Sequence, residues 1–203
     1  MKIRKFTGLI AAALLMTGLA SCDSKQTLAK DVNGSWSASP DRIADTEAMS
    51  TCIVRIVDFD KAPSQAGGDM ILSGLVSVSS QLPMSESVQQ PVSLTASGVA
   101  SIRGTWLAHD DDEIVVVLDP ETFTVNVDSS AVVLTTDILT GDDAPDLALL
   151  KPSAVAMVRQ QITQAAQTDF FSIHKIDDIK IHDNMMSCEI NDRDITLRRQ
   201  IDE

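Results

Sequence analysis

A period-two alternation of apolar and small polar residues constrains this chain more than any other feature. In residues 70–80, Met70, Leu72 and Val76 fall on one side of an extended chain, and serines occupy the other side. The same alternation recurs in the shorter segments 92–96, 102–108 and 123–127, and the apolar segments 114–118 and 131–139 are interpreted as further strands. Because successive side chains of a strand point to opposite faces, each segment is predicted as a half-buried antiparallel strand.

The turns between these segments are short. With 35–37 and 51–59 added, the chain has about eight strands before residue 140, and 119–122 (Asp-Pro-Glu-Thr) is predicted as a turn between two of them. In 102–108 the inward positions are expected to be Ile102, Gly104, Trp106 and Ala108. Many short strands at regular spacing favour a meander that closes into a barrel or folds into a sandwich.

A helix and three further strands are expected after residue 140. Residues 153–168 place apolar side chains at helical spacing, and Pro152 should separate this amphipathic helix from a shorter helical turn at 146–150. The last strands are predicted at 176–181, 185–190 and 195–201. The predicted fold is therefore mainly β, an antiparallel barrel or sandwich of about 8 to 11 strands with one helix near the C-terminus.

The N-terminal residues have the composition of a secretory signal. Three cations, Lys2, Arg4 and Lys5, precede an apolar run over 8–18 that is too short to span a bilayer. The run ends in Leu19-Ala20-Ser21-Cys22, which resembles the bacterial lipobox. The resemblance implies a lipoprotein signal peptide over 1–21, acylation of Cys22, and membrane anchoring in the cell envelope, on the periplasmic side or the cell surface. Residues 22–31 are expected to form a flexible tether, followed by a β domain over 32–203.

The charge balance excludes nucleic acid as a partner. The whole chain has a formal net charge of −13, and loss of the three signal-peptide cations changes it to −16. The chain has no basic cluster for phosphates, and it has only two Trp, five Phe and no Tyr for base stacking. The expected partners are the membrane, through the anchor, and a small apolar ligand or another envelope protein.

The two cysteines beyond Cys22 leave two alternatives. Cys52 and Cys188 both lie in predicted strands, and an oxidising envelope would allow one disulfide between them. Two buried free thiols in a core of small residues are the other alternative.

A three-residue motif that occurs twice suggests where a ligand would bind. Gly34-Ser35-Trp36 and Gly104-Thr105-Trp106 repeat the same pattern, and glycine two residues before tryptophan would leave room on the same strand face for the indole. The first copy resembles the Gly-x-Trp signature of lipocalins and other calycins, and the chain as a whole resembles Bacteroidota-type lipoproteins with a calycin-like barrel. The resemblance implies an apolar ligand cavity lined by Trp36, Trp106, Gly34 and Gly104. Alternatively, both tryptophans are only core side chains.

Motifs for catalysis or metal binding are weak. The run 109–113 (His-Asp-Asp-Asp-Glu) lacks the spacing of calcium loops and is expected to be a solvated hairpin tip, and no residue pattern predicts a metal site or a cofactor. Ser172 and Lys175 fit Ser-x-x-Lys without the partner motifs of penicillin-recognising enzymes. No catalytic residue is predicted. The favoured function is a non-enzymatic binding module, and the alternative is an envelope hydrolase that uses paired carboxylates.

Overall fold

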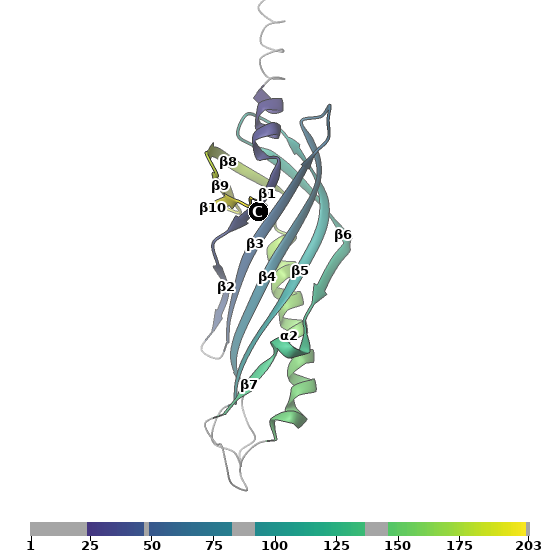
Figure 1. Ribbon diagram of the computed structural model, residues 1–203, viewed down its shortest axis with the longest axis vertical. Coiled ribbons are helices and arrows are strands. Elements are labelled where there is room, and N and C mark those ends of the chain that lie inside the picture. Colours follow the sequence, from purple (N-terminus) through teal and green to yellow (C-terminus); the bar gives the residue numbers. More distant parts are fainter. Residues whose placement is uncertain (1–23, 47–48, 83–91, 137–145, 202–203) are drawn as a thin grey trace, which may run out of the picture.

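The computed structural model describes residues 24–46, 49–82, 92–136 and 146–201 (Figure 1). The predicted signal peptide and Cys22 lie outside these residues. Within them the fold is mainly β, as predicted, with ten antiparallel strands in one sheet. The strands are β1 (Gly34–Ala38), β2 (Asp41–Thr46), β3 (Met49–Lys61), β4 (Gly67–Leu82), β5 (Val92–Ala108), β6 (Ile114–Asn126), β7 (Val133–Thr135), β8 (Lys175–His182), β9 (Met185–Ile190) and β10 (Arg193–Arg199). The helices are a segment over 24–32 and α2 (Leu147–Phe170), with a short 3₁₀ turn at Ser129–Ala131.

The strands pair in the order β1-β10-β9-β8-β6-β5-β4-β3-β2, and β7 pairs with β5. Strand β3 pairs along its whole length with β4. Strand β1 pairs with the C-terminal half of β3, and β2 pairs with the N-terminal half of β3. Because β1 also pairs with β10, the first and last strands of the domain are hydrogen-bonded to each other.

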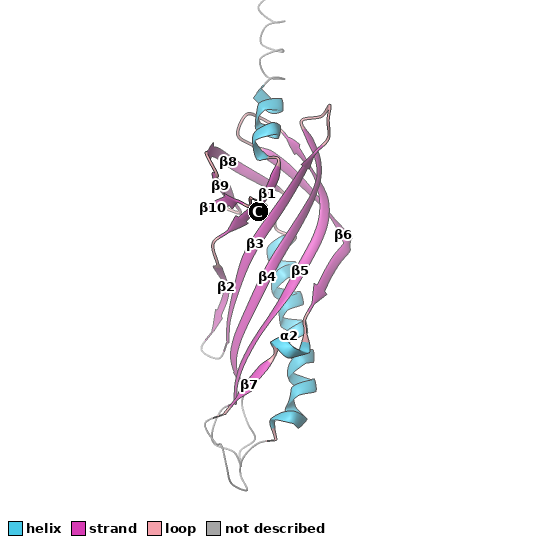
Figure 2. Cartoon of the chain, in the orientation of Figure 1, coloured by secondary structure: helices cyan, strands magenta, loops and turns pink. Residues whose placement is uncertain are grey.

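The predicted alternation sets which face of the sheet is buried. Met70, Leu72, Gly74, Val76 and Val78 of β4 are all buried, and the residues that alternate with them are exposed or half-buried. Helix α2 runs along the long strands and contacts β4, β5 and β6 (Figure 2). A Cβ atom on Gly74 would lie 2.6 Å from Ile53 Cδ1 and 3.1 Å from Phe170 Cζ, so the helix packs where β4 has no side chain. The core therefore lies between the sheet and this helix.

Two of the predicted strand breaks are wrong. Segments 92–96 and 102–108 belong to one 17-residue strand, β5. Residues 119–122 do not form a turn but lie within β6, where the register with β5 shifts between Ser101 and Arg103. Thr122 Oγ1 donates to the Asp119 carbonyl at 2.7 Å, so the polar residues of this segment satisfy one another locally. The extra residues form a bulge, which lets the strand continue through a proline.

The helices also differ from the prediction. Helix α2 is continuous from Leu147 and contains Pro152, whose exposed ring faces solvent, and Asp146 caps its start by accepting from Ala148 N at 3.0 Å. The flexible tether expected over 22–31 is a helix from residue 24 onward, because Leu28 and Ala29 pack into the core. The strand predicted at 131–139 is shortened to β7, and residues 137–145 lie outside the described part. The three-stranded C-terminal meander is confirmed.

Candidate functional site

A cavity of about 700 Å³ lies between three parts of the fold. One wall is the hairpin β2–β3, the second is the C-terminal half of α2, and the third is the turn between β9 and β10. The lining residues are Ile43, Ala44, Met49 and Thr51 from the hairpin, Gln161, Gln164, Ala165, Thr168 and Asp169 from α2, Ser172 after it, and Asn191, Asp192 and Arg193 from the turn.

Local chain geometry explains why these side chains converge. Residues three or four positions apart share one face of a helix, so Gln161, Gln164, Ala165 and Thr168 form a stripe along α2. The turn after β9 is tight because Asn191 and Asp192 both adopt positive φ, at 54° and 58°. Asn and Asp tolerate this conformation better than most residues, so the chain reverses here within two residues.

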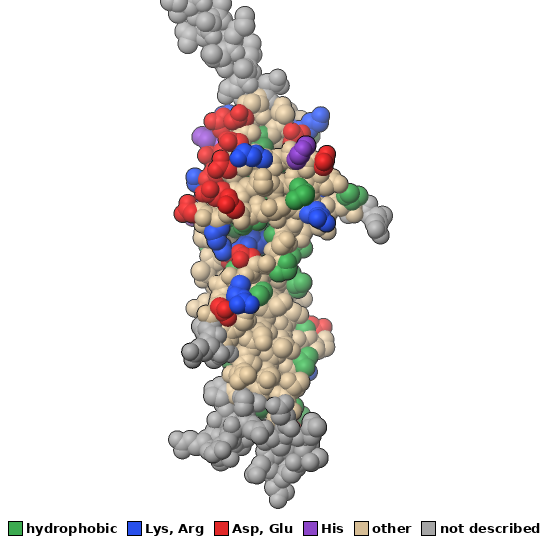
Figure 3. Space-filling view, turned by 90° about the vertical axis from the view of Figure 1, so that its left-hand side faces the viewer, with side chains coloured by type: hydrophobic (Ala, Val, Ile, Leu, Met, Phe, Trp, Pro, Cys, Tyr) green, Lys and Arg blue, Asp and Glu red, His purple; other side chains and the backbone are tan. Residues whose placement is uncertain are grey.

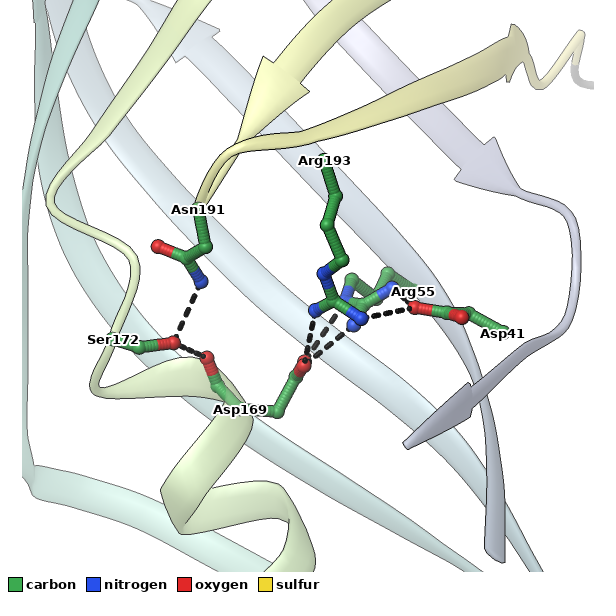
Figure 4. Close-up of polar contacts among 6 residues, drawn as sticks. All are labelled: Asp41, Arg55, Asp169, Ser172, Asn191 and Arg193. Atoms are coloured by element: carbon green, nitrogen blue, oxygen red, sulfur yellow. Dashed lines mark hydrogen bonds and ion pairs between the residues drawn. The ribbon is translucent and has the colours of Figure 1, made fainter. Parts of the chain in front are cut away.

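A buried ion pair closes the cavity at the end of α2. The side chain of Arg55 is only 2% exposed and that of Asp169 only 5%. Arg55 Nε donates to Asp169 Oδ2 at 2.8 Å, and its Nη2 donates to Asp169 Oδ1 at 2.5 Å, so the guanidinium grips both carboxylate oxygens (Figure 4). This two-point geometry fixes the end of α2 against β3.

Two further charges complete an alternating cluster of two arginines and two aspartates. Asp41 Oδ2 lies 3.0 Å from Arg55 Nη1 and 3.0 Å from Arg193 Nη1. Arg193 Nη2 lies 3.6 Å from Asp169 Oδ1. Burial tends to lower the pKa of Arg55, but its bonds to Asp169 and Asp41 outweigh this and raise the pKa above the ordinary value. Arg55 therefore stays charged, and the cluster joins α2, β2, β3 and β10.

Ser172 lies beside this cluster, and neither of its hydrogen-bond partners among the described residues is a base that would activate it. Its Oγ donates to the backbone carbonyl of Asp169 at 2.6 Å and accepts from Asn191 Nδ2 at 2.7 Å (Figure 4). Lys175, the other member of the Ser-x-x-Lys match, forms an ion pair with Asp177 at 2.5 Å. The described contacts thus make Ser172 a structural hydroxyl that holds the turn against α2.

Trp36 lies in the core, under a guanidinium group. It is fully buried, its Nε1 donates to the Val32 carbonyl at 2.7 Å, and the Arg199 guanidinium carbon lies 4.2 Å from its ring centroid. Gly34 has a φ of +115°, and a Cβ there would lie 3.1 Å from Arg199 Nη1. Glycine is therefore required by its backbone conformation and by the arginine.

Trp106 is packed differently. It is 3% exposed, donates to the Asp69 carbonyl at 3.0 Å, and meets the Phe59 ring edge-on at 5.2 Å. A Cβ on Gly104 would lie 2.4 Å from the Val117 carbonyl oxygen, so this glycine allows close approach of β6. Trp106 also lines a cavity of about 630 Å³ at the β3–β4 turn. A ligand site lined by Trp36, Trp106, Gly34 and Gly104 stays a prediction.

Cys52 and Cys188 are both free thiols, so the disulfide alternative is not what the structure contains. The alternation of β3 explains this, because Thr51 and Ile53 point inward and Cys52 therefore points outward. Cys188 is buried, 4% exposed, on the inward side of β9. Burial raises the pKa of the Cys188 thiol to about 12.

The Cys188 thiol should make stability depend on alkaline pH. Between pH 9 and 12 the unfolded chain releases a proton that the folded protein retains, so the free energy of unfolding falls as pH rises, by about 1.4 kcal/mol per unit. Urea denaturation between pH 8 and about 10 is expected to show this decline, and Cys188→Ala should flatten it. Cys52→Ala is the matched control and should keep the slope, and a slope unchanged in Cys188→Ala would contradict the assignment.

The remaining candidate residues from the sequence form no catalytic or metal-binding group in the described part of the chain. Residues 109–112 are exposed at the β5–β6 connection, as expected of a hairpin tip. Among the described residues no three His, Cys, Asp or Glu side chains are grouped as metal ligands, and none of the helices found there is long and apolar enough to cross a membrane. No protein-family profile and no curated protein sequence matches this chain.

Proposed function

We propose that this protein is a non-enzymatic binding module of the cell envelope that holds a small amphipathic ligand in the cavity between α2, β2–β3 and the β9–β10 turn. The observation that carries the proposal is the composition of that cavity. Its lining combines the apolar side chains of Ile43, Met49 and Ala165 with polar groups that include Gln161, Asp169 and Arg193. Its volume lies within the range of about 300–1,000 Å³ that is typical of small-molecule sites.

The location is proposed from the N-terminal sequence. The Leu-Ala-Ser-Cys segment that ends at Cys22 resembles the lipobox, and a diacylglyceryl anchor there would hold the domain at a membrane. The described part begins only two residues later, at Ser24. Mass spectrometry of the protein expressed in a bacterium that processes lipoproteins should find an acylated N-terminal Cys22, and Cys22→Ser should abolish acylation.

The calycin-like barrel is proposed as the form of the sheet. Two pairings support it, because β1 pairs with β10 on one side and with β3 on the other. Strand β1 thereby joins the two ends of the strand order. The pairing of β6 with β8 is short, with Ile114 opposite Ile176 and Val115 opposite Lys175. Helix α2 packs against the long strands beside this short pairing.

The hydrolase alternative has one supporting observation. Asp41 and Asp169 come from different elements and lie around the same two arginines (Figure 4). Each carboxylate, however, is already engaged by both guanidinium groups, an arrangement that positions neither to protonate a leaving group or to hold a water. The cluster is better suited to fixing the cavity wall than to chemistry.

Binding in this cavity is tested with a neutral fluorescent dye, N-phenyl-1-naphthylamine, and two matched variants of α2. Ala165 lines the cavity, and Ala156 is exposed on the same helix away from it. Ala165→Phe is expected to fill the cavity and reduce the dye's fluorescence enhancement at least fivefold, whereas Ala156→Phe should leave it unchanged. Equal dye binding by both variants would place the dye elsewhere and contradict the proposed site.

A further inference from the structure

Gln161 is a lining residue with an unsatisfied hydrogen-bonding group. Its Oε1 is buried, and it has no hydrogen-bond partner among the described residues. The side chain itself borders the cavity. A buried acceptor without a donor costs free energy, and the terminal amide of a glutamine rotates within a broad torsional range, so binding requires it to turn toward the ligand. A ligand with an N–H or O–H group would remove that cost.

The other polar lining groups are mostly uncharged. Five of them are hydroxyls and amides, from Thr51, Gln164, Thr168, Ser172 and Asn191. The Thr168 and Ser172 hydroxyls donate to backbone carbonyls of the protein, so the donors for a ligand come from the amides of Gln164 and Asn191, and acceptors come from both kinds of group. Such a set matches neutral head groups such as alcohols and amides.

The charges around the cavity disfavour an anion. Arg55 and Arg193 are paired with Asp41 and Asp169, and this leaves Asp192 as an exposed carboxylate on the lining. The wider surface is also acidic, because Asp and Glu side chains gather on the upper half of the face in Figure 3. A carboxylate or phosphate entering the cavity would meet no uncompensated cation among the described lining residues, while it would have to give up its hydration. An ammonium group would give up its hydration as well, and Asp192 is exposed to solvent, where a charge pair contributes little.

The cavity is elongated along the helix. Gln161 and Asp169 are eight residues apart on α2, which at 1.5 Å per residue separates them by about 12 Å along the axis. Between these two positions α2 contributes Gln164, Ala165 and Thr168 to the lining, and Ile43 and Met49 line the cavity from the β2–β3 hairpin. An aliphatic chain laid along the helix would contact Ala165, Ile43 and Met49, so an extended chain suits this lining.

We infer that the ligand is a neutral single-chain amphiphile, an aliphatic chain whose uncharged head group donates a hydrogen bond to Gln161. This inference rests on the proposed function, because it assigns a ligand class to the same cavity. Gln161 is then the specificity-determining residue, which selects a hydrogen-bond donor over a hydrocarbon or an anion.

The inference is tested by calorimetric titration of the full chain carrying Cys22→Ser, at a pH near 8. Four probes of the same chain length are compared, which are decan-1-ol, decanamide, decanoate and decylammonium. The alcohol and the amide are expected to bind at least tenfold more tightly than either charged probe. Gln161→Leu should weaken binding of the alcohol about tenfold, as expected for the loss of one hydrogen bond. Gln167→Leu, at an exposed position of α2 that does not line the cavity, is the matched control and should bind like the unmodified protein.

The outcomes separate the two proposals. If decanoate or decylammonium binds as tightly as decan-1-ol, and Ala165→Phe blocks that binding, the cavity is a binding site but the neutral-ligand inference is wrong. If Gln161→Leu binds decan-1-ol as tightly as the unmodified protein does, the role of Gln161 is wrong. If none of the four probes binds and the dye is also unaffected by Ala165→Phe, the proposed function itself fails.

Discussion

Replacing Arg55 by methionine is expected to lower the free energy of unfolding by about 3–5 kcal/mol, the range for removing one partner of a buried ion pair. The substitution leaves the Asp169 carboxylate, 5% exposed, without the guanidinium that bonds both of its oxygens. Methionine keeps much of the side-chain volume. The loss of stability is therefore caused mainly by the unpaired Asp169 charge and only in small part by a cavity. Chemical denaturation monitored by circular dichroism measures it.

A double variant separates the ion pair from packing. Arg55→Met combined with Asp169→Leu removes both charges, and it is expected to recover a large part of the stability lost in Arg55→Met alone. A loss below about 1 kcal/mol for the single variant would contradict the buried cluster, because such small values are typical of exposed pairs.

The charge of Arg55 should be insensitive to pH near neutrality. The pKa of Arg55 is raised in the folded protein above a value that is already far above neutral, so the stabilising charge is fully present near neutral pH and is lost only as pH rises through the raised pKa. Arg55 is therefore expected to keep its charge, and its ion pair with Asp169, between about pH 6 and pH 9.

Replacing Trp36 by alanine is expected to cost about 3–5 kcal/mol, the range for deleting a large buried aromatic side chain. The indole is fully buried, it bonds the end of the 24–32 helix through the Val32 carbonyl, and Arg199 stacks on it. Arg199 also donates to the Asn33 and Asp31 carbonyls at 2.7 and 2.6 Å. Loss of the indole should therefore loosen the N-terminal helix as well as the core.

Hydrogen exchange and thermal denaturation measure these effects. Trp36→Phe retains an aromatic ring for Arg199 but not the bond to Val32, so its loss should be smaller than that of Trp36→Ala. Trp36→Ala is expected to speed amide exchange in residues 24–32 far more than Trp106→Ala does. Equal exchange in the two variants would contradict the role assigned to Trp36.

The period-two pattern predicted most of the sheet because burial of one face imposes it residue by residue. Met70, Leu72 and Val76 are inward as expected. The pattern failed to predict the strand where neighbouring polar residues form hydrogen bonds with one another, as in the Asp119–Thr122 bulge of β6. It also failed at the 24–32 helix, because only the contacts of Leu28 and Ala29 with the core reveal why a polar segment is ordered.

The candidate cavity was harder to predict, because it depends on contacts between residues that are distant in sequence. Arg55 and Asp169 are 114 positions apart. Each nevertheless gave a signal, since Arg55 occupies an inward position of β3 between Ile53 and Val57, and Asp169 continues the buried face of α2. A charged residue on the apolar face of β3 and one on the apolar face of α2 suggest that these two side chains form a pair. The position of Arg193, by contrast, depends on the register between β9 and β10, and no feature of the sequence indicates that register.

The most direct test of the proposed site is to map the amides that respond to decan-1-ol. Two-dimensional NMR of the nitrogen-15-labelled protein should show the largest shift changes at cavity residues, including Thr51, Gln161, Thr168 and Asn191. Amides on the outer face of the sheet, such as Ser77 and Thr95, should stay unchanged. Shift changes concentrated on that outer face or around Trp106, with the cavity amides unmoved, would contradict the assignment of this cavity as the binding site.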